Sequence, residues 1–121
     1  MKLLLATIEV IRKQAVDRIA TRGKDGIYIL KYEDAVAYKN HLINGGDPLA
    51  LAGFEMLSEH SAFGMTPAEF ADYVITKRAE WKTKIAKIEL LSSQAKVIIE
   101  AAGSDEPSAE VLAIVDQIRL A

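Results

Sequence analysis

Apolar residues recur at helical spacing along the first 22 residues of the chain. They follow one another at steps of four, three, four and four residues, at Leu4, Ile8, Ile11, Ala15 and Ile19. This spacing places them on one stripe of an α-helix, because 3.6 residues complete a turn. Gly23 can adopt the left-handed conformation that ends a helix. The pattern therefore predicts a helix over residues 1–22, followed by a turn in Gly23-Lys24-Asp25-Gly26.

A second helix is predicted over residues 27–44 and a short third helix over residues 49–61. Ile27–Leu30 could also form a strand, since its residues are mostly β-branched or aromatic, but the chain has no second strand candidate to pair with it. The segment Asn44-Gly45-Gly46-Asp47-Pro48 ends the second helix, because glycine and proline interrupt helices. The short helix is expected to bury Leu49, Leu51, Phe54, Met56 and Leu57.

The clearest start signal in the chain precedes a helix predicted over residues 66–102. Thr66 and Glu69 have the spacing of a capping box, and Pro67 between them suits the first helical position. No glycine or proline follows until Gly103, so one helix of about 35 residues can form. Its apolar seam alternates in steps near three and four, at Phe70, Val74, Trp81, Ile85, Ile88, Leu91 or Ser92, Ala95, Ile99 and Ala102. Such spacing is typical of coiled-coil-like packing.

A last helix is predicted over residues 105–120, started near Pro107. Its apolar residues need a partner surface, and they are Val111, Ile114, Val115 and Ile118. The chain has 121 residues, of which half are apolar and only three are proline, a composition typical of one ordered domain. We therefore predict a single all-α domain over residues 1–121. It is expected to be an elongated helical bundle or hairpin with one long helix and short flanking helices, in which residues 3–22 pair antiparallel with part of residues 66–102.

The length of the predicted 66–102 helix bears on self-association. Such a helix would be about 55 Å long, whereas a compact domain of this size is only about 35 Å across. Either the first helix packs back along it, or another chain buries the part that projects. We expect a closed homo-oligomer in which the long helices of neighbouring copies pack together. The candidate interface residues are Val74, Trp81, Ile85, Ile88, Ala95, Ile98 and Ile99.

The sequence offers few residues for catalysis or for binding a cofactor. It has no cysteine and only two histidines, which excludes a disulfide framework, a thiolate metal site and a cysteine nucleophile. Ser58-Glu59-His60-Ser61 brings hydroxyl, carboxylate and imidazole groups together in sequence, but neighbours on a helix point in different directions. His41, near a helix end, is better suited to the helix dipole than to a metal. We therefore expect no enzymatic activity, no metal and no cofactor.

The charges argue against nucleic acid as a partner, because the net charge is −2. The main basic group borders the long apolar seam on both sides, where such charges steer an acidic neighbour, and it consists of Lys77, Arg78, Lys82, Lys84 and Lys87. Residues 1–24 are mainly basic and residues 103–121 mainly acidic. These ends are either solvated helix faces or attract each other or a neighbouring copy. No segment reaches the roughly 18 apolar residues that span a bilayer, so a membrane is not an expected partner.

Two segments of the chain match a known module in the order and separation of their residues. The first covers Ala15–Asn40, with Arg18-Ile19-Ala20-Thr21, a glycine-flanked connector, Tyr28, Lys31-Tyr32 and Glu33-Asp34-Ala35-Val36-Ala37-Tyr38. The second is Thr66-Pro67-Ala68-Glu69-Phe70-Ala71-Asp72-Tyr73-Val74-Ile75, followed by Trp81, Ile88-Glu89, Ala95-Lys96 and Ile99-Glu100-Ala101-Ala102. Together they resemble a module of small virion and tail-region proteins of tailed bacteriophages.

This resemblance implies a non-enzymatic structural or tail-associated protein of a bacteriophage. Such a protein would be made in the host cytoplasm, would lie in the tail region of the virion, and would contact itself and other tail or virion proteins through its helices. The alternative is a tail-fibre assembly chaperone, or a small cytoplasmic adaptor, that is not retained in the particle.

Overall fold

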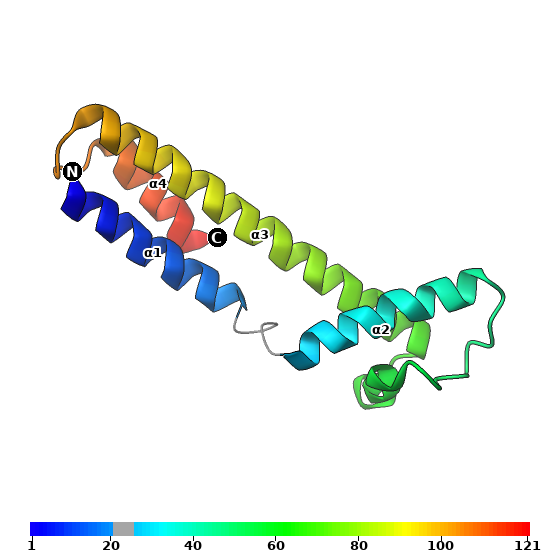
Figure 1. The fold of residues 1–121 in the computed structure, drawn as a ribbon. Coiled ribbons are helices and arrows are strands. Elements are labelled where there is room, and N and C mark those ends of the chain that lie inside the picture. The colour runs from blue at the N-terminus through cyan, green and yellow to red at the C-terminus, as the bar shows by residue number, and fades with distance from the viewer. Residues whose placement is uncertain (21–25) are drawn as a thin grey trace. The chain divides into compact units, whose positions relative to one another are not determined.

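The structure is a computed structural model that describes residues 1–20 and 26–121, and it is built from helices (Figure 1). The helices are α1 (Lys2–Ala20), α2 (Gly26–Ile43), the 3₁₀ helix η1 (Glu55–Phe63), α3 (Pro67–Ala102) and α4 (Ala109–Leu120). The described residues contain no strand, so the all-α prediction with one long helix is confirmed. The predicted stop at Gly23 and most of the turn that follows it lie outside the described residues.

The chain divides into two compact units, each with its own core. Unit 1 comprises Met1–Thr21 and Trp81–Ala121, and unit 2 comprises Arg22–Glu80, in each case as far as the described residues reach. α3 contributes residues to both units. The single-domain organisation expected from the sequence stays a prediction.

In unit 1, α1 packs against α3 through the apolar stripe seen in the sequence. The stripe residues Ile8, Ile11, Ala15 and Ile19 are all buried. Their partners in the same core are Ile88, Leu91, Ala95, Ile99, Val111, Ile114, Val115 and Ile118. Polar contacts give the direction, since Glu9 contacts Lys96 whereas Arg12 contacts Glu89. The two helices therefore run antiparallel, as predicted (Figure 1).

The last helix, α4, completes the core of unit 1, but it begins later than the predicted residue 105. Ser108 is its N-cap, with an extended backbone and a side-chain oxygen that accepts from the Val111 amide at 3.2 Å. Pro107 precedes this cap, and a residue before proline is disfavoured in helical conformation, so the helix cannot include the segment from 105. Asp105 instead pairs with the amino group of Met1. Of the two interpretations of the oppositely charged ends, attraction between them is seen at this contact.

In unit 2, α2 forms a helix through Ile27–Leu30, so the helical reading of that segment was correct. The core of the unit consists of Ala35, Tyr38, Leu57, Phe70, Ala71 and Val74. Two tyrosines of α2 anchor it: Tyr28 donates to the Val74 carbonyl at 3.0 Å and Tyr38 to the Pro48 carbonyl at 2.6 Å. Burial raises the pKa of Tyr38. These bonds satisfy hydroxyl groups that would be costly to bury alone.

The short helix predicted over residues 49–61 is present, but it begins later than predicted and is a 3₁₀ helix. Residues 49–54 form turns, and a 3₁₀ helix runs over Glu55–Phe63. The reason lies in Gly53, whose φ of +88° is incompatible with a helix. Leu49, expected inside, is 81% exposed, because its amide is held by the Asp47 carboxylate in a turn. Leu57, by contrast, is fully buried, as expected.

The start of α3 is confirmed in detail. The Thr66 amide donates to the Glu69 carboxylate at 3.0 Å, and the Glu69 amide donates to the Thr66 hydroxyl at 3.2 Å. This reciprocal pair is the capping box that the sequence predicts. α3 then continues without interruption to Ala102, and Gly103 follows with a φ of +65°. The long helix is therefore one continuous element.

Candidate docking groove

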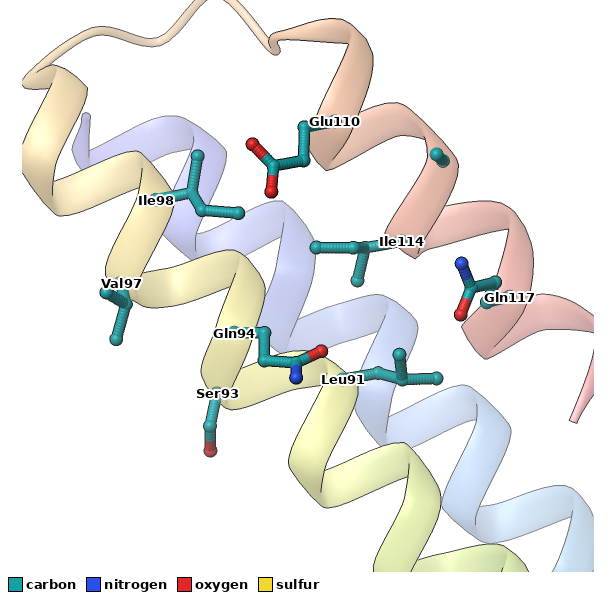
Figure 2. A pocket seen from close by; sticks show the side chains of 9 residues that line it. Leu91, Ser93, Gln94, Val97, Ile98, Glu110, Ile114 and Gln117 are labelled. Atoms are coloured by element: carbon teal, nitrogen blue, oxygen red, sulfur yellow. The ribbon is translucent and has the colours of Figure 1, made fainter.

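An open groove of about 610 Å³ lies between α3 and α4 in unit 1. We call it the α3–α4 groove. It is lined by Leu91, Ser93, Gln94, Val97 and Ile98 from α3 and by Glu110, Ala113, Ile114 and Gln117 from α4. Figure 2 shows Ile98 and Glu110 at one end and Leu91 and Gln117 at the other. The groove therefore follows both helices for about two turns.

The groove has an apolar floor and polar edges. Leu91 and Ile114 are almost fully buried and belong to the core of unit 1, and Ile98 packs against that core. Gln94, Glu110 and Gln117 point into the gap between the two helices (Figure 2) and are exposed. Val97, at the groove, leaves 67% of its surface exposed. An apolar floor beside a polar edge is the arrangement that accepts an amphipathic helix.

The α3–α4 groove forms because the apolar residues of α4 face the core. Val111, Ile114, Val115 and Ile118 are all buried, so the partner surface that they require is supplied by α1 and α3. The residues of α4 next to this face, Ala113 and Gln117, are exposed. Since Ala113 is small, it leaves space beside α3 that a larger side chain would fill.

The residues predicted as an interface between copies lie in two different cores. Val74 is 1% exposed and belongs to unit 2. Ile88, Ala95 and Ile99 are buried in unit 1, and Trp81, Ile85 and Ile98 are partly buried against them. The sequence argument for an interface rests on part of the seam being left uncovered by its own chain. Within unit 1 the chain itself covers this seam, chiefly by α1 and α4, and an interface between copies at these seven residues stays a prediction.

The structure brings only Ile98, among those seven residues, to the α3–α4 groove. Val97 and Ala113 were missed because neither lies on an apolar stripe of its helix. One signal was available in the sequence: Val97 is a large apolar residue one position before the interface candidate Ile98, where a solvated helix face would normally be polar.

The side chains of Ser58, Glu59 and His60 do not form a catalytic arrangement. Ser58 donates to the Glu55 carbonyl at 2.6 Å, Glu59 pairs with Lys31 at 2.9 Å, and His60 Nδ1 donates to the Met65 carbonyl at 2.8 Å. The three side chains therefore hold local structure and do not contact one another through hydrogen bonds. Within residues 1–20 and 26–121, no three His, Cys, Asp or Glu side chains are grouped so as to hold a metal ion.

Two residues of the basic group on α3, Lys77 and Arg78, make contacts within unit 2. The Arg78 guanidinium lies over the ring of Tyr32, 4.3 Å from its centre. Lys77 lies 5.7 Å from the ring centre of Tyr73 and pairs with Glu80 at 3.3 Å. Lys82, Lys84 and Lys87 are exposed.

Comparisons with protein-family models, with curated proteins and with solved structures find no match to this chain. The resemblance to bacteriophage tail proteins therefore stays an expectation from the sequence segments. In the part of the chain that the structure describes, none of the helices is long and apolar enough to cross a bilayer.

Proposed function

We propose that this protein is a non-enzymatic docking protein that holds an amphipathic helix of a partner protein in the α3–α4 groove. The observation that carries this proposal is the α3–α4 groove. It follows the two helices for about two turns and has Leu91, Ile98 and Ile114 on its floor. A helix laid along it would place side chains at positions i, i+3 or i+4, and i+7 on that floor. Docking of this kind requires no cofactor.

The edges of the groove indicate the chemistry of the partner helix. Glu110 is the ionisable residue of the lining, and the other polar groups are the amides of Gln94 and Gln117 and the hydroxyl of Ser93. A partner helix with an apolar stripe bordered by lysine, arginine or amide side chains would satisfy these groups. An acidic helix would instead face Glu110 with like charge.

The biological setting follows from the resemblance described above. We place the protein in the tail region of a bacteriophage virion, where its partner is another tail or virion protein. Mass spectrometry of purified particles tests this placement, since a virion component is present at a fixed copy number. Absence from the particle, together with binding to a fibre protein in the host cytoplasm, would favour the assembly chaperone or adaptor instead.

The docking proposal has a direct test in photo-crosslinking. A photoreactive phenylalanine analogue at Ala113 should crosslink one partner when the protein is expressed with the proteins of its own particle. The matched control places the same analogue at Leu112, which is also exposed on α4 but does not line the groove. Crosslinks from position 113 alone support the groove. Equal crosslinking at both positions, or crosslinking from position 112 only, contradicts it.

A further inference from the structure

α2 carries apolar residues on two different faces, and only one of them is covered. One face carries Ala35 and Tyr38, both fully buried in the core of unit 2. The other face exposes Ile29, Val36 and Ile43, whose exposed fractions are 45%, 36% and 80%. We call these three residues the α2 stripe. They follow at steps of seven residues, so they lie on one line about 21 Å long along the helix.

Polar residues on one side of the α2 stripe have no partner in the described structure. Glu33 and Asn40 lie between the stripe residues along the helix, both on the same side, and both are exposed. No hydrogen bond or ion pair joins either side chain to the rest of the described chain. On the opposite side of the stripe, Lys39 pairs with Asp72 at 2.8 Å and the ring of Tyr32 carries Arg78. The side chains on that side thus have partners within unit 2, whereas the side chains of Glu33 and Asn40 can bind another chain.

We propose that two copies of this chain pair through α2 in an antiparallel, twofold-symmetric contact centred on Val36. The α2 stripe is symmetric about this residue, so Ile29 of each copy meets Ile43 of the second copy. Val36 meets its own equivalent at the axis. The apolar residues are thereby covered along the whole stripe, and the contact closes on itself as a dimer.

The polar residues select the antiparallel direction. In an antiparallel pair the same sides of the two helices face each other, which places Glu33 of one copy within about one residue's rise of Asn40 of the second copy. The Asn40 amide can then donate to the Glu33 carboxylate, twice per dimer. In a parallel pair these sides lie on opposite edges of the contact, so the carboxylate and the amide of the two copies do not meet. The complementarity is therefore between two copies of one chain.

The proposal is independent of the α3–α4 groove, which lies in unit 1. A protein that fails to bind a partner helix could still dimerise through α2, and the reverse also holds. The two failures are therefore distinguishable.

Sedimentation equilibrium tests the dimer at micromolar concentrations, where the mass should approach twice the 13.3 kDa of one chain. Val36→Glu should raise the dissociation constant about tenfold or more, because it places a charge at the centre of the contact. Ile43→Glu, at a position too exposed to be needed for folding, should act in the same direction. The matched control is Leu49→Glu, since Leu49 is 81% exposed in the same unit but lies off the stripe. A wild-type monomer, or a dimer unaffected by Val36→Glu and Ile43→Glu, overturns the proposal.

Introduced cysteine residues test the direction of the contact. Because the sequence has no cysteine, crosslinks can form only at the introduced positions. Full-length Val36→Cys should crosslink to itself on treatment with a short bismaleimide. A mixture of Ile29→Cys and Ile43→Cys chains, one of them carrying a mass tag, should crosslink mainly between the two kinds of chain. Predominant crosslinks between identical chains would show a parallel contact and contradict the proposal. Circular dichroism of each variant confirms that the helices are intact.

Discussion

Lys96 on α3 donates to the Glu9 carboxylate on α1 at 3.0 Å, across the antiparallel helix pair of unit 1. Glu9 also accepts from Arg12 Nε at 2.9 Å, and Arg12 in turn reaches Glu89 on α3 at 2.7 Å. Four charged side chains thus form a network over the buried contact between the two helices. The hydrogen bonds from Arg12 and Lys96 lower the pKa of Glu9 from 4.5 to about 2.

This lowered pKa predicts a specific pH dependence of stability. Between pH 4.5 and about 2, Glu9 remains ionised in the folded chain but is protonated in the unfolded chain. Its stabilising contribution is therefore present above about pH 4.5 and is lost as the pH falls toward 2. We expect about 1 kcal/mol or less, because Glu9 is half exposed and such pairs are screened. The free energy of unfolding, measured by urea denaturation, should differ less between pH 7 and pH 2.5 for Glu9→Gln than for the wild type. An equal difference in the two proteins would contradict this account.

The buried hydroxyl of Ser92 predicts a stabilising substitution. Ser92 is 1% exposed, and its Oγ has no hydrogen-bond partner within the described part of the chain. Ser92→Ala removes this desolvated group and improves helix propensity, so the free energy of unfolding should rise by about 1 kcal/mol. Ser93→Ala is the control, because Ser93 is exposed on the same helix and should gain only a few tenths of a kcal/mol from propensity. Thermal or urea unfolding measures both, and a loss of stability in Ser92→Ala would show that the hydroxyl has a stabilising partner.

Close packing at the end of α2 predicts that Gly46 cannot be replaced without cost. A Cβ on Gly46 would overlap the His41 ring. This ring is held by a 3.0 Å contact from Nε2 to the Asp47 carbonyl and lies 5.2 Å, centre to centre, from the ring of Phe54. Gly46→Ala should therefore destabilise the chain by about 1–3 kcal/mol. In a chain that already carries His41→Ala the same change should cost much less, as a double-mutant cycle by urea denaturation would measure. Equal costs in both backgrounds would exclude the ring as the cause.

Local signals predicted the helices better than they predicted the surfaces between them. The start of α3 was predictable to the residue, because the capping box of Thr66 and Glu69 involves only neighbours in sequence. The turns over residues 49–54, before η1, were not predictable, since the positive φ of Gly53 depends on how the loop packs. A glycine in sequence does not reveal which conformation it adopts.

The α3–α4 groove depends on how the helices pack against one another, which the spacing of apolar residues in the sequence does not reveal. The seam of α3 was identified correctly as apolar and its antiparallel pairing with α1 was predicted, but the sequence could not show that α4 would also cover it. The α3–α4 groove exists because Ala113 is small and lies opposite α3, a relationship that only the packed helices define. Likewise, the exposure of Ile43 on α2 becomes visible only when the covered face of that helix is known.

The central claim, that the α3–α4 groove receives a partner helix, is tested most directly by filling the groove. Ala113→Trp should occupy the space beside Ile98 and Ile114, whereas Leu112→Trp adds the same side chain on the neighbouring exposed position outside the groove. Both proteins should fold with unchanged helix content. When each is purified with its associated proteins from the cells that naturally contain it, the Leu112→Trp protein should retain the partner that the wild type binds, and the Ala113→Trp protein should lose most of it. Equal retention by both variants would show that the partner does not bind in the groove.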